Sequence, residues 1–293
     1  MNSSISCILI RYLKHERTFA IFLILLFVAF SCKGNSSEEV RKPESAYGPI
    51  RTDTIIVYDN STTILKCIYK YESDSLLFRL ILPKDYVSSG SFPLLLFFHG
   101  AGERGDDNVS QMNLISDFIE SDLFQKQSSF VILPQCPAGE KWVDADWTQL
   151  TSIFKDVPEK SMSLTIKLLN RVLDAYKVDT NRLYVMGLSM GGFGTWDIIT
   201  RIPDKFAAAV PICGGGDEEQ AYKLNNIPIW AFHGSKDKLV NVSRSRNIAS
   251  RVKSFNGNII YTEYKNVGHN AWSYAFKDSK LISWIYSKSK FRK

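Results

Sequence analysis

Short apolar runs alternate along most of the chain with longer segments in which apolar residues recur at intervals of three and four. Runs of four to eight apolar residues between turn-forming residues are typical of strands, whereas the longer spacing is typical of amphipathic helices. The pattern predicts strands at 54–58, 63–71, 76–82, 94–98, 130–133, 183–186, 207–212, 227–232 and 258–264. It predicts helices near 112–124, 159–176, 192–201, 218–223, 242–255 and 279–288.

This alternation of strands and helices predicts an α/β fold with one mostly parallel central sheet and helices on both faces. The run Leu94–Phe98 is apolar without interruption, as expected of a strand that is buried on both sides. The segment between Ile212 and Ile227 is short, so we expect no large lid. We expect the folded domain to span residues 52–293.

The N-terminus has a different pattern, in which basic residues precede twelve consecutive apolar residues, Phe19–Phe30. A run of this length suits an export signal and is shorter than the roughly 20 residues that span a bilayer. We therefore expect residues 1–31 to be a signal peptide. Ser31-Cys32 resembles a bacterial lipobox, in which the cysteine becomes lipidated after cleavage.

Lipidation at Cys32 would make the protein an exported cell-envelope lipoprotein of the outer membrane or periplasm, held at the membrane by its lipid anchor. The polar segment 33–50 lacks apolar periodicity and reads as a flexible tether. Two alternatives remain open at this point: a cleaved, soluble secreted protein, and an uncleaved anchor.

Composition narrows the function classes. The 293 residues are 45% hydrophobic and 23% charged, as expected of a globular chain. The net charge of +6 is spread along the chain without a run of basic residues and aromatics, so we expect no nucleic-acid partner. No pair of cysteines has metal-type spacing, and we expect no metal. Cys67, Cys136 and Cys213 are either buried free thiols or include one disulfide.

Three candidate catalytic residues each follow a predicted strand, in the order Ser189, Asp237, His269. Ser189 lies in Gly187-Leu188-Ser189-Met190-Gly191, between an apolar strand and a predicted helix, as a nucleophile elbow requires. A serine is a weak nucleophile unless a histidine takes its proton and a buried carboxylate orients that histidine. The sequence therefore predicts a Ser-His-Asp triad.

Other residues of the same types are weaker candidates. His99 and His233 each precede a glycine directly after a strand, where a histidine more often orients a loop than acts as a base. Asp217 and Glu263 are the alternative acids, and we expect both to be solvated. The small-residue turn after His99 predicts an oxyanion hole formed by the backbone N–H groups of Ala101 and Met190.

These motifs resemble the bacterial α/β-hydrolases of the phospholipase/carboxylesterase and dienelactone-hydrolase-like group, which also resembles the catalytic domain of prolyl oligopeptidases. The resemblance covers residues 60–290 and rests on five motifs, namely His99–Gly105, Pro134-Gln135-Cys136-Pro137, Gly187–Gly192, His233-Gly234 with Asp237, and Gly268-His269-Asn270 with Trp272. It implies the α/β-hydrolase fold, ester hydrolysis through an acyl-enzyme, and no metal or organic cofactor. Dienelactone hydrolases use a cysteine nucleophile where this chain has Ser189.

The substrate is indicated only by aromatic residues. Trp142, Trp147 and Trp272 lie in loops predicted near the catalytic edge of the sheet and are candidate substrate contacts. The alternative is that most of these rings pack in the core or cover loops. Aromatic rings and an open site favour small or exposed esters, such as acetyl or feruloyl esters on carbohydrate. The alternatives are a serine peptidase acting on short peptides and a non-catalytic surface binding protein.

Overall fold

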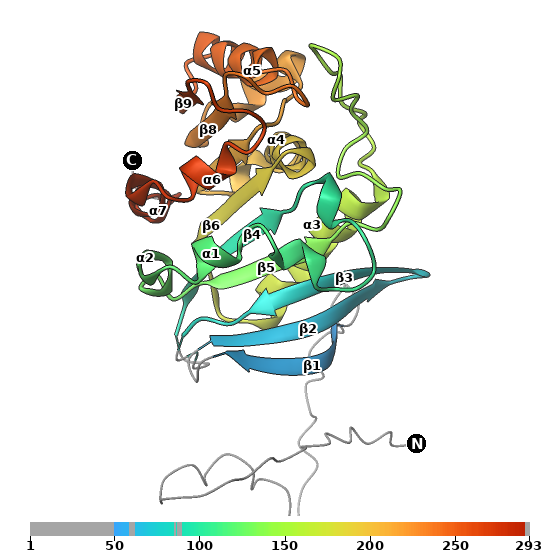
Figure 1. Ribbon diagram of the computed structural model, residues 1–293. Coiled ribbons are helices and arrows are strands. Elements are labelled where there is room, and N and C mark those ends of the chain that lie inside the picture. The colour runs from blue at the N-terminus through green and yellow to red at the C-terminus, as the bar shows by residue number, and fades with distance from the viewer. Residues whose placement is uncertain (1–49, 59–61, 85, 87–89, 291–293) are drawn as a thin grey trace, which may run out of the picture. The chain divides into compact units, whose positions relative to one another are not determined.

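The computed structural model describes residues 50–58, 62–84, 86 and 90–290 (Figure 1). The predicted signal peptide, Cys32 and nearly all of the predicted tether lie outside these residues. The first strand already begins at Ile50, inside the segment expected to be tether. Within the described part of the chain, no helix is both long and apolar enough to cross a membrane.

Nine strands form one sheet in the order β1-β2-β3-β5-β4-β6-β7-β8-β9. They are β1 (Ile50–Tyr58), β2 (Thr62–Tyr71), β3 (Asp74–Ile81), β4 (Phe92–Phe98), β5 (Phe130–Gln135), β6 (Val178–Leu188), β7 (Ala208–Ile212), β8 (Ile229–Gly234) and β9 (Ile259–Tyr264). Pairing is antiparallel from β1 to β3 and between β3 and β5, and parallel from β5 through β4 to β9.

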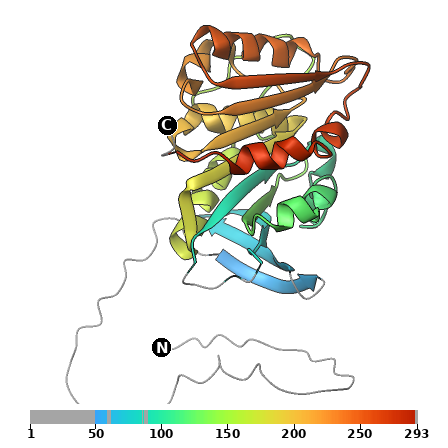
Figure 2. The ribbon, with the colours of Figure 1, turned by 90° about the vertical axis from the view of Figure 1, so that its left-hand side faces the viewer.

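The α-helices are α1 (Ser116–Ile119), α2 (Asp122–Gln125), α3 (Lys160–Ala175), α4 (Met190–Arg201), α5 (Ser243–Ser254), α6 (Trp272–Ala275) and α7 (Ser279–Tyr286). The 3-10 helices are η1 (Ala101–Glu103), η2 (Ser110–Met112), η3 (Pro203–Lys205) and η4 (Glu218–Leu224). Helices cover both faces of the sheet (Figure 2), which confirms the predicted architecture. The segment between β7 and β8 holds only η4, so no large lid interrupts it.

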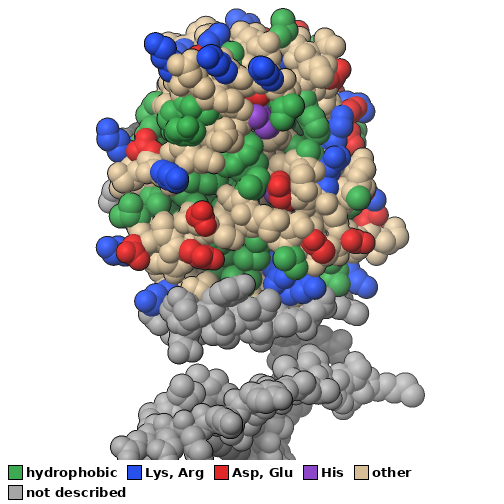
Figure 3. All heavy atoms as spheres, viewed as in Figure 1, with side chains coloured by type: hydrophobic (Ala, Val, Ile, Leu, Met, Phe, Trp, Pro, Cys, Tyr) green, Lys and Arg blue, Asp and Glu red, His purple; other side chains and the backbone are tan. Residues whose placement is uncertain are grey.

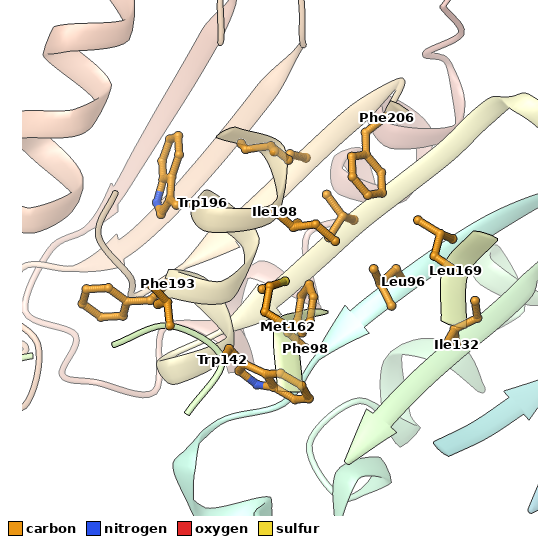
Figure 4. Close-up of a cluster of buried hydrophobic side chains, with 14 of the residues drawn as sticks. Leu96, Phe98, Ile132, Trp142, Met162, Leu169, Phe193, Trp196, Ile198 and Phe206 are labelled. Atoms are coloured by element: carbon orange, nitrogen blue, oxygen red, sulfur yellow. The ribbon is translucent and has the colours of Figure 1, made fainter. Parts of the chain in front are cut away.

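Two hydrophobic cores lie on opposite faces of the sheet because successive strand residues point to opposite sides. In β4, Leu96 and Phe98 belong to the core beneath α3, α4 and α5 (Figure 4). Leu95 and Phe97 belong to the second core, beneath α1, α2, α6 and α7. Every residue of Leu94–Phe98 is therefore buried, as its unbroken apolar run predicted.

The predicted helix at 112–124 is instead three short pieces: η2, α1 and α2. Ser121 interrupts it with an extended backbone, φ −64° and ψ 142°. Its hydroxyl donates to the Phe118 carbonyl at 2.7 Å and accepts the Phe124 N–H at 3.4 Å, so it ends one helix and caps the next. A serine hydroxyl that bonds to nearby backbone groups competes with the backbone hydrogen bonds of a helix. Here it ends the helix even though the apolar residues continue at helical spacing.

The sheet order reverses at β4, because the chain passes from β4 to β5 on one side and then to β6 on the other. Ligand sites in open α/β sheets form at such a switch point, beyond the carboxyl ends of the strands. Phe98 pairs with Gly187 and Leu188 with Ile212, so β4, β6 and β7 end side by side. The loops that follow these strands therefore meet at one edge.

Candidate active site

Ser189 occupies a strained turn between β6 and α4. Its backbone has φ 55° and ψ −121°, a conformation that is unfavourable for a residue with a side chain. A Cβ on Gly187 would collide with the Gly191 carbonyl, and one on Gly191 would collide with the Phe98 carbonyl. Only glycine fits at these two positions, which gives the Gly-x-Ser-x-Gly spacing its physical reason.

A hydrogen-bonded chain links the three predicted catalytic residues. His269 Nε2 lies 2.8 Å from Ser189 Oγ, and His269 Nδ1 lies 2.7 Å from Asp237 Oδ2. Asp237 follows β8, His269 follows β9, and Ser189 directly follows β6. The Asp237 side chain is fully buried, whereas the His269 side chain is 16% exposed. The imidazole can therefore exchange a proton with a molecule that enters from solvent.

Several donors hold the Asp237 carboxylate. Its Oδ1 accepts the backbone N–H groups of Leu239 and Val240 at 2.9 and 3.0 Å. Its Oδ2 lies 3.1 Å from His233 Nε2, in addition to its contact with His269. Burial by itself would raise the pKa of Asp237, but the hydrogen bonds from His233, His269 and Val240 outweigh it and hold that pKa well below its usual range. Asp237 is thus an ionised partner for His269.

The turn after β4 lies against Ser189. The position of a Cβ on Gly100 would be 3.6 Å from Ser189 Cβ, and Ala101 is the next residue. Arg104 donates to the Ala101 carbonyl at 2.9 Å and braces this turn. Met190 begins α4, where the first N–H groups of a helix have no intrahelical acceptor. Both predicted oxyanion donors therefore belong to segments that flank Ser189.

A family model described as phospholipase/carboxylesterase matches residues 88–285. The chain belongs to the phospholipase/carboxylesterase family. The match includes the elbow and the segments that carry Asp237 and His269. It confirms the α/β-hydrolase resemblance inferred from the motifs.

Three esterases are similar to this phospholipase/carboxylesterase chain. A bifunctional acetylxylan esterase/xylanase of Neocallimastix patriciarum is 29% identical over 150 residues, 51% of this chain and 20% of that protein. Feruloyl esterase D of Neurospora crassa is 22% identical over 189 residues, 60% and 58% of the two chains. The crystal structure of a thermostable esterase superposes with a TM-score of 0.71 at 35% identity, covering 77% of this chain and 63% of the other. Each match spans less than two thirds of the relative's length.

His233 and His99 do not contact Ser189, as expected of histidines that orient loops. His233 is fully buried, and its Nδ1 lies 2.7 Å from Ser245 Oγ. The sequence interpretation missed its contact with Asp237. The spacing of four residues between His233 and Asp237 is a signal that could have suggested it.

His99 braces two loops as a neutral imidazole. Its Nε2 accepts the Cys136 N–H at 2.9 Å, so the proton is on Nδ1, which donates to the Gly100 carbonyl at 2.6 Å. Burial lowers the pKa of His99 to about 4. His99 therefore ties the turn after β4 to the end of β5.

The alternative acids make other contacts. Asp217 is buried rather than solvated, a correction to the sequence-based expectation: its carboxylate accepts the Phe154 N–H at 2.9 Å and the Glu219 N–H at 3.0 Å. Glu263 pairs with Arg246 through two hydrogen bonds of 2.6 and 2.8 Å. Both carboxylates therefore bond to groups other than His269.

The three tryptophans differ in position. Trp142 is fully buried and donates to the His99 carbonyl at 3.1 Å, so it belongs to the core and cannot contact substrate, contrary to expectation. Trp147 is partly exposed beneath the Lys141 ammonium group. Trp272 is partly exposed and meets the His269 ring edge-on, with ring centroids 5.3 Å apart.

The buried cysteines Cys67, Cys136 and Cys213 are free thiols, which settles the alternative left open by the sequence. Cys213, His233 and Asp237 bring ligand-type atoms within 4.8 Å of one another. Burial raises the pKa of Cys213 to about 12, and its thiol donates to the His269 carbonyl at 3.2 Å. A protonated thiol and a hydrogen-bonded His-Asp pair suit positioning of His269 better than metal ligation.

Proposed function

We propose that this chain is a serine hydrolase that cleaves carboxylic esters with Ser189, His269 and Asp237. The observation that carries the proposal is the hydrogen-bonded chain from Ser189 Oγ through His269 to Asp237, built on a nucleophile elbow. Membership of the phospholipase/carboxylesterase family and the similarity to three esterases support it.

In the first half of the reaction, His269 Nε2 takes the Ser189 proton while Oγ attacks the ester carbonyl carbon. The carbonyl oxygen becomes an oxyanion, to which the Ala101 and Met190 N–H groups donate. The intermediate then collapses, the alcohol oxygen leaves with the proton from His269, and the acyl group stays on Oγ. Asp237 stabilises the imidazolium that forms between these steps.

Water completes the cycle. His269 takes a proton from a water molecule, whose oxygen attacks the acyl carbon and regenerates a tetrahedral oxyanion in the same site. Collapse returns the proton to Ser189 and releases the carboxylic acid. The cycle consumes one ester and one water, and it releases one alcohol and one carboxylic acid.

We further propose acetyl or feruloyl esters on carbohydrate as the substrate class. The names of two similar proteins, an acetylxylan esterase and a feruloyl esterase, support this choice. The partly exposed Trp272 beside His269 offers an aromatic surface close to the reacting atoms. Carbohydrate esters outside the cell also fit the export predicted from residues 1–31.

A burst experiment tests the activity. The protein is expected to release p-nitrophenol from p-nitrophenyl acetate in a burst that equals the enzyme concentration, followed by slower turnover. Ser189→Ala should abolish both phases, and a fluorophosphonate probe should label the wild type at Ser189 alone. Folded wild-type protein that neither turns over nor takes the label would instead favour a binding protein. Faster cleavage of a matched amide than of the ester would favour a peptidase.

A further inference from the structure

A groove of about 460 Å³ lies between the segment carrying α1 and α2 and the segment carrying α6 and α7. Its apolar lining residues are Leu114, Phe118, Leu123, Trp272, Phe276 and Ile282, half of them aromatic. Phe118 and Ile282 are buried members of the core, Leu123 is exposed, and the other three residues are partly exposed. The groove is therefore an open surface with a fixed, packed base.

The rim of the groove is polar. Asn113 and Asp117 stand on one side and Ser273 and Lys277 on the other, and all four are exposed. An amide, a carboxylate, a hydroxyl and an ammonium group together offer both donors and acceptors. Apolar walls with a few polar groups around them are the usual composition of a small-molecule site.

Trp272 connects this groove to the proposed catalytic centre. Trp272 is one of the residues that line the groove, and its ring meets that of His269 at 89° with centroids 5.3 Å apart. His269 is also the only described histidine with more than marginal surface, since His99 and His233 are buried. Hydrophobic side chains gather on the face where α1 and α6 lie, around a purple patch of histidine surface (Figures 1 and 3).

The proton transfer from His269 indicates which part of an ester would lie near the groove. His269 must hand its proton to the departing alcohol oxygen, so that oxygen lies within hydrogen-bond reach of Nε2. The carbonyl oxygen points instead toward the turn after β4 and the start of α4. An alcohol portion that extends past His269 in the direction of Trp272 would reach the groove.

We propose that the groove binds the carbohydrate that carries the ester, as the leaving-group subsite of the enzyme. The inference rests on the proposed esterase function. A sugar ring presents C–H groups on its faces, which pack on Trp272 and Phe276, and hydroxyl groups on its edge, which bond to Asn113 and Asp117. A purely aliphatic leaving group would offer no hydrogen-bond partners to the polar side chains of the rim.

Two esters with the same acyl group test the subsite: acetylated xylotriose and p-nitrophenyl acetate. In the double variant Asn113→Ala, Asp117→Ala, the kcat/KM ratio of the first to the second should fall at least tenfold, mainly through the KM for the sugar ester. Glu120→Ala is the matched control, since Glu120 is an exposed acid directly after α1 that does not line the groove. Its ratio should stay at the wild-type value.

A binding measurement separates this inference from the proposed activity. In calorimetry, unacetylated xylotriose should bind to the Ser189→Ala protein, and it should also quench the tryptophan fluorescence of that protein. Its affinity should fall when Asn113→Ala and Asp117→Ala are combined with Ser189→Ala. Wild-type protein that cleaves both esters, with an unchanged ratio in the double variant and no xylotriose binding, overturns the subsite alone. If the double variant lost kcat/KM on p-nitrophenyl octanoate but not on the sugar ester, the groove would bind the acyl chain. That result would also overturn the leaving-group subsite. Wild-type protein that cleaves neither ester refutes the proposed activity instead.

Discussion

Asp237 is held between two histidines, of which only His269 reaches Ser189. His233 Nε2 approaches the same carboxylate oxygen at 3.1 Å and also lies 3.0 Å from the Val240 carbonyl. Its other ring nitrogen lies 2.7 Å from Ser245 Oγ, which in turn lies 2.9 Å from the Gly214 carbonyl. His233 is thereby fixed in orientation, and it holds the carboxylate in place for His269. We assign it a positioning role, because it is buried and cannot touch substrate.

This role predicts different effects for two substitutions at His233. Asn places its amide near the Ser245 contact, whereas Gln can carry an N–H to the Asp237 carboxylate. His233→Asn should lower kcat by about 10- to 100-fold, since a hydrogen bond to a charged group contributes about 1.5–3 kcal/mol. His233→Gln should retain more of kcat, and KM should change little in both. Steady-state kinetics on p-nitrophenyl acetate across pH 5–9 measure this.

The two His233 variants are compared only after their melting temperatures show that both are folded. Equal loss of kcat in the folded Asn and Gln variants would contradict a role through Asp237. A change confined to KM would do so as well, because it would imply contact with substrate.

At the scale of elements, the elbow depends on close contact between β4, β6 and α4. Gly191→Ala should destabilise the fold because its Cβ has no room beside the Phe98 carbonyl. We expect a cost of about 3 kcal/mol, equivalent to roughly 6–12 °C in Tm for a chain of this size. Differential scanning calorimetry measures it. Gly102→Ala is the control, since a Cβ there meets no atom within 4 Å, and an equal fall in its Tm would refute the explanation.

Helix α4 also carries a buried acid, Asp197. Burial raises its pKa to about 6, although the Arg201 guanidinium donates to it at 2.8 Å and acts in the opposite direction. The folded protein therefore holds this proton more tightly than the unfolded chain. The resulting stabilisation is complete below about pH 4 and is lost as the pH rises through 6.

Asp197→Asn removes this titration. The free energy of unfolding of the variant, relative to wild type, should rise by about 3 kcal/mol between pH 4 and pH 7. Urea unfolding at several pH values measures the difference. A difference that stays constant over this range would show that Asp197 is already ionised at pH 4 in the folded protein.

At the scale of the whole molecule, the central strands β4, β6 and β7 supply side chains to both cores. The helices on either face therefore pack against the same strands. The edge of the sheet that carries Ser189 is supported by both hydrophobic cores. His269 lies between β9 and α6, so its position is set by the sheet and by the core under α6 and α7 together.

We propose that residues 1–31 direct export and that Cys32 carries a lipid, with the following polar segment as a tether. Radiolabelled palmitate should then enter the full-length protein in a bacterium that processes lipoproteins, and Cys32→Ala should abolish the label. Cys7→Ala is the matched control, because Cys7 lies within the segment that is removed, and it should keep the label. Label that persists in Cys32→Ala, or is never incorporated, would contradict the anchor.

The hydrophobic pattern and the residues after each strand were enough to predict the α/β architecture and the order Ser189, Asp237, His269. Strand periodicity and glycine spacing are local properties, and the carboxyl ends of parallel strands meet at one edge whatever the details of packing. The same local reasoning predicted one helix at 112–124, where the Ser121 hydroxyl instead divides the segment into short pieces.

Only the tertiary structure decided which side chains reach that edge. Trp142 and Trp272 have the same chemistry, yet one packs against Phe98 in the core and the other lies beside His269. The contact of His233 with Asp237 and the groove next to Trp272 likewise depend on segments brought together by packing. The sequence by itself was enough to predict the candidate catalytic residues and their order, since these follow from residue type and local pattern. Burial and direction in space arise from contacts between distant segments, so the structure alone decided the surroundings of the reacting groups.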